Sequence, residues 1–277
     1  MNPFEAAAIT AAGFAAGTVN AVVGSGSLIT FPTLLAFGYP AVTANVSNNI
    51  GLVPGAFSGA YGFRRELRGQ GRRARTLAIG SGSGGLVGAT LLLTLPSDVF
   101  DTIVPLLILL ACALMALQPR LSAWISHRRV ERARDVGVAP LTVVFLAGIY
   151  GGYFGAAQGV ILLATLGVLL PDEMVRTNAL KNVLAGTVNL LAALLFIIAA
   201  HVEWPVVALI AVGSVIGGQV GAHVGRRIPA NVLRLLVVAL GLGVALAEFC
   251  CAYTKPWSTF TVVDRVVRSS SPIRRST

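Results

Sequence analysis

The sequence predicts an all-α polytopic membrane protein made of two inverted repeats of four elements, with a re-entrant or broken helix in each repeat. The 277 residues are 55% hydrophobic and 12% charged, with a mean hydropathy of +0.80, whereas a soluble domain carries roughly 25% charged residues. Sliding the chain by 133 positions without a gap lays Asn45 on Asn178 and Asn49 on Asn182. This register holds for about 70 residues and indicates an internal duplication.

The first repeat is predicted over residues 4–117. Its first apolar stretch, residues 4–38, is too long for one ordinary span and is interrupted by the Gly-Ser-Gly-Ser segment at 24–27. A re-entrant hairpin and a pair of helices both fit this pattern. Three further apolar runs follow, at residues 41–63, 77–95 and 99–117.

Residues 118–140 are polar and rich in arginine, and they are predicted to form a basic cytoplasmic linker between the repeats. The second repeat, residues 141–252, shows the same order of elements. It begins with a long interrupted stretch at 141–170 and continues with apolar runs at 175–200, 206–225 and 232–252. Residues 253–277 are rich in Ser and Arg and are predicted to be a disordered tail.

The arginines predict how the repeats face the membrane. Six arginines lie between residues 64 and 75, so this loop is expected on the cytoplasmic side. The corresponding loop of the second repeat, residues 200–205, has no Lys or Arg, whereas basic residues follow the next run at Arg226 and Arg227. The two repeats are therefore expected to have opposite orientations. The five basic residues of the tail argue against the external C-terminus that results, and its side stays open.

Composition also argues against several functions. The net charge of +10 comes from basic blocks that flank apolar runs, which favours an orientation signal over nucleic-acid binding. The three cysteines and three histidines have no metal-ligand spacing and no partner for nucleophilic catalysis, so no enzyme activity, metal or cofactor is expected. Glycines four apart at Gly80, Gly84 and Gly88 could pack internally or form a homodimer.

Amide side chains and interrupted backbone predict a site for a small anion inside the lipid bilayer. Asparagines four apart share one face of a helix, and each amide offers two donors. If the repeats are related by an axis in the membrane plane, the asparagine pairs should converge near the midplane, as in secondary transporters. The candidate substrate-binding residues are Asn45, Asn49, Asn178, Asn182, Ser25, Gly26, Ser27, Gln158, Gly159 and Lys181.

Two of these assignments have structural alternatives. Asparagine in a membrane helix can simply hold neighbouring helices together. Lys181 could attract a buried anion, or it could extend to the interface beside Arg176, Asp172 and Glu173. No carboxylate is placed to carry a proton or cation, so a coupling ion is not predicted.

The segments GTVNAVVGSGSLITFPTLLAFGYPAVTANVSN and GIYGGYFGAAQGVILLATLGVLL, the latter followed by RTNALKN, resemble the TauE/SafE family of sulfite exporters. The resemblance covers residues 13–246 and implies a multi-pass transporter of the bacterial plasma membrane that exports sulfite or an organosulfonate such as sulfoacetate. It also implies that the two interrupted segments and the four asparagines form the site. Ala156 and Ala157 stand where family members often have glycine. Transport of another small anion, or a non-transporting assembly scaffold, is the alternative.

Overall fold

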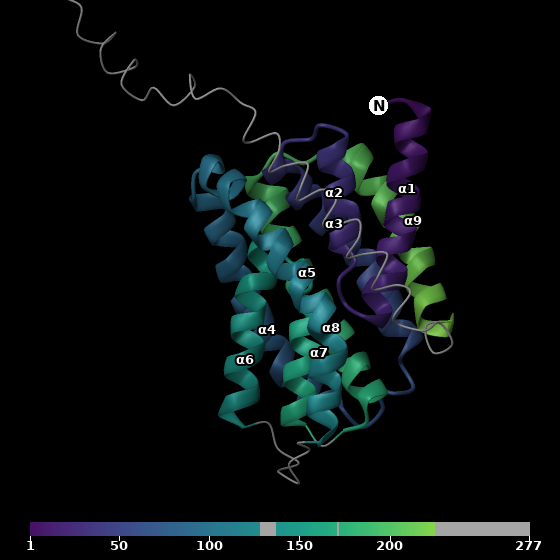
Figure 1. Ribbon diagram of the computed structural model, residues 1–277, viewed down its shortest axis with the longest axis vertical. Coiled ribbons are helices and arrows are strands. Elements are labelled where there is room, and N and C mark those ends of the chain that lie inside the picture. Colours follow the sequence, from purple (N-terminus) through teal and green to yellow (C-terminus); the bar gives the residue numbers. More distant parts are fainter. Residues whose placement is uncertain (128–136, 171, 225–277) are drawn as a thin grey trace, which may run out of the picture.

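The computed structural model describes residues 1–127, 137–170 and 172–224, which form nine helices and no strand (Figure 1). The all-α prediction is confirmed for these residues. The predicted run at 232–252 and the tail at 253–277 lie outside the described residues. The helices are α1 (Pro3–Val22), α2 (Ser27–Ala36), α3 (Ala41–Gly62), α4 (Gly71–Thr94), α5 (Ser97–His127), α6 (Val138–Tyr153), α7 (Gln158–Leu169), α8 (Met174–Ala199) and α9 (Trp204–Val224).

Four described helices are long and apolar enough to cross a membrane: α4, α5 over Ser97–Gln118, α8, and α9 over Trp204–His223. The helices α2 and α7 have only 10 and 12 residues. At 1.5 Å per residue, neither can span the roughly 30 Å of hydrocarbon alone. Helix α5 continues to His127, well into the segment predicted as linker.

Each interrupted stretch forms two helices because the backbone turns at a residue with positive φ. Just beyond the end of α1, Gly24 has a φ of +90°, and its N–H donates to the Val19 carbonyl over 3.1 Å. Just beyond the end of α6, Gly155 (φ 78°) donates to the Tyr150 carbonyl over 3.1 Å in the same way. This arrangement satisfies carbonyls that the helix end leaves free. Ala157, just before α7, also has a positive φ of 61°, although it carries a Cβ.

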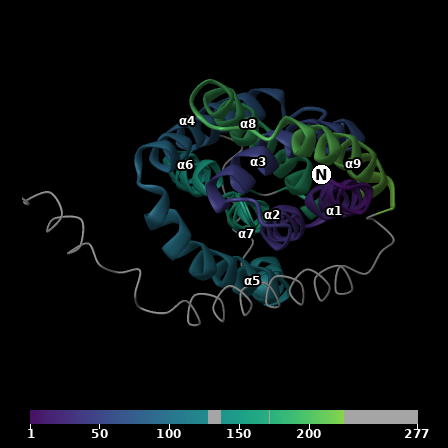
Figure 2. The same ribbon diagram turned by 90° about the horizontal axis from the view of Figure 1, so that it is seen from above.

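Helices from one half of the chain pack against helices from the other half. Helix α1 lies along α9, and α4 lies along α6, on opposite sides of the molecule (Figure 2). Glycines allow this close approach: a Cβ on Gly84 would lie 2.1 Å from the Phe145 carbonyl oxygen, and one on Gly88 would lie 2.0 Å from that of Ile149. The predicted glycine face of α4 therefore packs internally, against α6.

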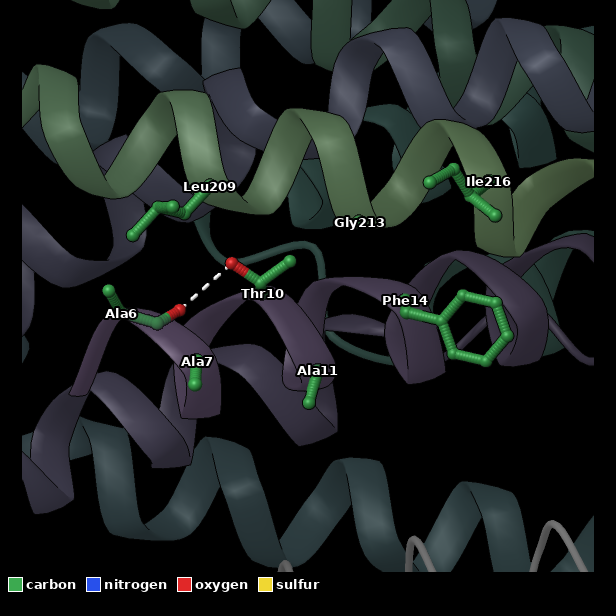
Figure 3. A pocket seen from close by; sticks show the side chains of 8 residues that line it. All are labelled: Ala6, Ala7, Thr10, Ala11, Phe14, Leu209, Gly213 and Ile216. Carbon is green, nitrogen blue, oxygen red and sulfur yellow. Dashed lines mark hydrogen bonds between the residues drawn. The ribbon is translucent and has the colours of Figure 1, made fainter. Parts of the chain in front are cut away.

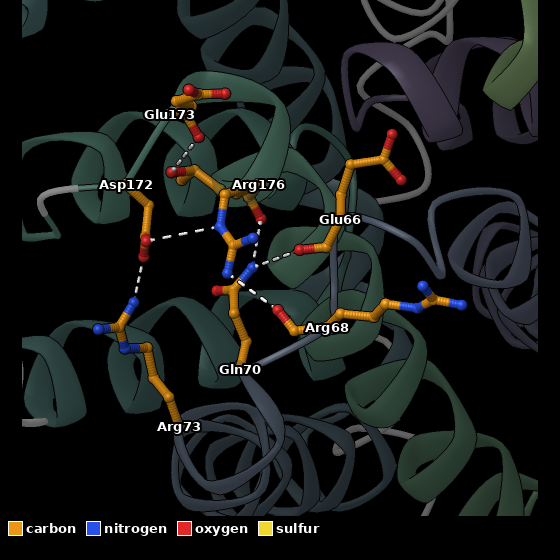
Figure 4. A network of polar contacts seen from close by, with 8 residues as sticks. Glu66, Arg68, Gln70, Arg73, Asp172, Glu173 and Arg176 are labelled. Carbon is orange, nitrogen blue, oxygen red and sulfur yellow. Dashed lines mark hydrogen bonds and ion pairs between the residues drawn. The ribbon is translucent and has the colours of Figure 1, made fainter.

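The loops gather at two ends of the molecule. At what we call the basic end, the α3–α4 loop meets the start of α8 (Figure 4). There, Asp172 pairs with Arg73 and lies 3.7 Å from Nε of Arg176, which donates from Nη2 to the Arg68 carbonyl over 3.0 Å. This network joins the first half of the chain to the second.

The opposite end, which we call the N-terminal end, holds the start of α1, the α2–α3 loop and the α8–α9 loop. The Tyr39 hydroxyl donates to Glu5 over 2.7 Å, and the Glu203 N–H donates to Ser47 Oγ over 3.0 Å. The pKa of Tyr39 is raised to about 12. Burial of the hydroxyl is the main cause, and the Glu5 carboxylate adds to it. Helix α3 joins the two ends, and its 22 residues extend about 33 Å.

Candidate functional site

The two helix breaks, one from each half of the chain, touch through their backbones. The Gly159 N–H donates to the Gly24 carbonyl over 3.0 Å. A Cβ built on Gly24 would lie 2.5 Å from the Gly159 Cα, and one built on Gly159 would lie 2.4 Å from the Gly24 Cα. We call this contact the Gly24–Gly159 crossing. Only glycine at both positions permits it.

The predicted asparagines bind helix ends that belong to the other half of the chain. Asn178 and Asn182, on α8, donate to the Ala21 carbonyl at the end of α1 over 3.0 and 3.2 Å. Asn45, on α3, donates to the Tyr153 carbonyl at the end of α6 over 3.0 Å. The last carbonyls of a helix have no partner within the helix. These amides therefore stabilise the two breaks.

The two asparagine pairs do not meet at one point, which differs from the expected convergence. Helices α3 and α8 run antiparallel, because Asn49 Nδ2 lies 3.5 Å from Asn189 Oδ1 while Gly186 lies beside Ala56. In this register Asn178 is level with the far end of α3, more than about 20 Å along the axis from Asn45. Both asparagines lie one turn into their helices and stay near opposite ends of the core. Their role in substrate binding stays a prediction.

Lys181 lies fully buried beside the Gly24–Gly159 crossing. Its side chain is 0% exposed, and Nζ donates to the Asn20 carbonyl near the end of α1 over 2.9 Å. Its Cδ would be 3.2 Å from a Cβ on Gly24. Of the two alternatives for Lys181, extension to the interface is not observed. The carbonyls at a helix C-terminus carry partial negative charge, which suits an ammonium partner.

Polar atoms near the breaks have incomplete hydrogen bonding. Gln158 is 2% exposed, and in the described part of the chain its Nε2 has no partner; the same holds for Asn49 Oδ1 and Asn178 Oδ1. Buried polar atoms are normally paired. Such free donors and acceptors are available to a ligand or to water.

The predicted residues of the first break have mainly internal contacts. Ser25 Oγ donates to Met115 Sδ of α5 over 2.6 Å, and Ser25 is 1% exposed. A Cβ on Gly26 would lie 2.2 Å from the Ala16 carbonyl oxygen, so Gly26 lets α2 pack on α1. Ser27 begins α2 and is half-buried.

Sequence reasoning missed two polar contacts of this region. Asn189, which is 8% exposed, is the partner of Asn49, and Thr30 donates from its hydroxyl to Asn48. The signal for Asn189 was present, because it follows Asn182 by seven residues and so lies on the same face of α8. The contact of Thr30 with Asn48 depends on how α2 folds back on α3.

Comparisons with known proteins find relatives that are named membrane transporters. A probable membrane transporter protein of Sinorhizobium is 27% identical over 235 residues, covering 85% of this chain and 88% of its own. A probable membrane transporter protein of Haemophilus influenzae is 28% identical, covering 82% and 88%, and YfcA of Escherichia coli K12, also named a probable membrane transporter protein, is 25% identical, covering 80% and 81%. No solved structure matches the chain significantly.

The apolar helices and these relatives define a multi-pass membrane transporter of the plasma membrane. The sequence profile described as "Sulfite exporter TauE/SafE" matches residues 9–247, and the chain belongs to this family. The predicted family and membrane location are confirmed. The transporter names of the relatives also agree with the expectation that the protein is not an enzyme.

Proposed function

We propose that the protein is a secondary transporter that exports a small sulfur-containing anion, sulfite or an organosulfonate such as sulfoacetate. The observation that carries this proposal is the charge of the interior. Among the described residues, Lys181 is the only Lys, Arg, Asp or Glu in the buried class, and its side chain is basic. The unpaired Gln158 Nε2 adds a donor near the second break. A described interior with a basic side chain and a free donor, and without a buried carboxylate, suits an oxyanion.

The same proposal includes alternating access around the Gly24–Gly159 crossing by two inverted repeats. Its support comes from where each pair of broken helices begins. The α1–α2 pair starts at the N-terminal end with Glu5, whereas α6 starts at the basic end beside the start of α4, since Gly80 lies beside Leu141 and Gly84 beside Phe145. Pairs that enter from opposite ends would let each half open the crossing to one side. An interior-negative membrane potential favours outward movement of an anion by about 2.3 kcal/mol per charge per 100 mV.

Flux of a labelled anion tests the function. In proteoliposomes we expect sulfite efflux, and we expect it to fall more than about tenfold in Asn45→Ala and in Asn178→Ala. Asn45→Ala leaves the Tyr153 carbonyl unpaired at a cost of about 1–3 kcal/mol, and Asn178→Ala removes one of the two amide donors to the Ala21 carbonyl. Thr90→Ala is the control, since Thr90 is exposed and its hydroxyl donates to the Leu86 carbonyl of its own helix.

Unchanged flux in folded Asn45→Ala and Asn178→Ala would reject the amides as part of the transport pathway. A panel of sulfite, thiosulfate, sulfoacetate, sulfate and chloride identifies the substrate. Chloride flux without sulfite flux would favour another small anion. Absence of saturable flux for every anion would favour an assembly scaffold.

The inverted arrangement has its own test. Reporter fusions at Arg68, in the α3–α4 loop, and at Ala200, in the α8–α9 loop, should report opposite sides of the membrane, with Arg68 cytoplasmic. The two loops lie at the two ends of the molecule, where Arg68 contacts Arg176 and the Glu203 N–H contacts Ser47. Fusions that report the same side would contradict opposite orientations of the repeats.

A further inference from the structure

Two equivalent grooves lie on opposite outer faces of the molecule. One, of about 470 Å³, runs between α4 and α6, and the other, of about 540 Å³, runs between α1 and α9 (Figure 3). The internal duplication relates them, since Thr76, Gly80 and Ser83 of the first correspond to Leu209, Gly213 and Ile216 of the second. The α4–α6 groove is lined by Thr76, Ile79, Gly80, Ser83, Leu141, Thr142 and Phe145.

The walls of the α4–α6 groove are apolar despite three hydroxyl side chains. Thr76 donates to the Arg72 carbonyl, Thr142 to the Val138 carbonyl and Ser83 to the Gly80 carbonyl, over 3.1, 3.1 and 2.9 Å. Each hydroxyl is therefore satisfied within its own helix. Ile79 remains 74% exposed, so the groove presents hydrocarbon to the membrane. An acyl chain fits this surface.

The two grooves differ in charge at one end. Arg72 lies four residues before Thr76, and Arg75 lies four before Ile79, so both arginines continue the groove face of α4. Both are exposed, and in the described part of the chain neither forms an ion pair, whereas Arg73 between them pairs with Asp172. In the α1–α9 groove the corresponding positions hold uncharged residues, Pro205 and Ala208.

We propose that the groove between α4 and α6 is a binding site for an anionic phospholipid. Its acyl chain lies along the apolar walls, and its phosphate binds Arg72 and Arg75 at the basic end. The α1–α9 groove takes acyl chains without selecting the headgroup, because it lacks these arginines. An orientation signal requires positive charge at this end of the protein. The same signal does not explain why Arg72 and Arg75, which form no ion pair in the described part of the chain, lie on the helix face that lines an apolar groove.

Native mass spectrometry of the full chain in detergent tests this site. Phosphatidylglycerol and phosphatidylcholine with the same acyl chains are added at low salt. We expect preferential binding of phosphatidylglycerol, and we expect Arg72→Gln with Arg75→Gln to weaken it about 30-fold, because each basic residue near a lipid surface contributes about fivefold. Phosphatidylcholine binding should not change. Arg65→Gln with Arg68→Gln is the control, since these exposed arginines of the same end lie outside the groove.

The acyl-chain part has a matched pair of variants. Ser83→Trp fills the α4–α6 groove and should reduce phosphatidylglycerol binding, whereas Ile216→Trp, at the corresponding position of the other groove, should leave it unchanged. Equal loss in the two arginine double variants would show a diffuse basic surface and overturn the proposal. So would equal binding of both lipids, or full displacement by glycerol phosphate at the concentration of the lipid.

Discussion

Gly159→Ala is expected to prevent assembly of the transporter core. The new Cβ would lie 2.4 Å from the Gly24 Cα, which is backbone and cannot move aside as a side-chain end can. The two breaks would have to separate, and the 3.0 Å hydrogen bond from the Gly159 N–H to the Gly24 carbonyl would be lost. Overpacking a well-filled core costs about 1–3 kcal/mol or more. The measurements are the yield of monodisperse protein, its thermal midpoint and anion flux.

Glycines elsewhere in the chain provide the controls for this result. Gly186→Ala should be tolerated, because its Cβ would meet nothing closer than 3.5 Å. Gly24→Ala and Gly38→Ala have similar positive φ values, +90° and +84°, and share a conformational cost of about 1–2 kcal/mol. A Cβ on Gly38 would have no atom within 4 Å. The difference in stability between these two variants therefore isolates the effect of the Gly24–Gly159 crossing. Equal behaviour of Gly159→Ala and Gly186→Ala would contradict it.

Lys181→Met is expected to stop anion transport while the protein stays folded. The substitution removes the one buried Lys, Arg, Asp or Glu in the described part of the chain and introduces a long apolar side chain. The variant avoids the cost of burying an amine, which offsets the cost of about 1–3 kcal/mol for the Asn20 carbonyl that loses its donor. Loss of a charge-assisted hydrogen bond to the anion should reduce flux roughly 10- to 100-fold. Flux and the thermal midpoint are measured on the same preparation.

A purely structural Lys181 gives a different pattern. If its ammonium only stabilises the end of α1 through the Asn20 carbonyl, the thermal midpoint and the flux should fall together. Lys181→Asn is a useful second variant, because asparagine is the residue at the corresponding position 48 of the first half. It keeps a donor without the charge, so it separates hydrogen bonding from charge. Full flux in Lys181→Met would remove Lys181 from the transport mechanism, whereas full flux in Lys181→Asn alone would show that a hydrogen-bond donor is sufficient at this position.

Much of the fold could be predicted because the membrane restricts backbone structure. Apolar runs near 20 residues identify α4, α5, α8 and α9, and the Gly-Ser segment at 24–27 correctly indicates a break. The end of α5 was harder to predict. This helix continues to His127 through polar residues, because a helix beyond the hydrocarbon needs no apolar surface.

The sequence did not predict which groups the candidate site residues contact, and their role in substrate binding stays a prediction. Asn45 and Asn178 do contact helix breaks, but each contacts the break of the other half. Corresponding positions in a duplicated sequence give equivalent roles, not equal depth in the membrane. Depth depends on how far each residue lies from the start of its helix and on the register of α3 against α8.

The sequence by itself determined the class of protein and the residue types available for an anion, and it predicted an internal duplication, because composition and an ungapped register depend only on the order of residues. Only the tertiary structure decided that Gly24 meets Gly159, that Lys181 binds the Asn20 carbonyl, and that α1 packs on α9. These contacts join residues far apart in the chain. They depend on the direction and depth at which each helix enters the core, which a linear pattern does not record.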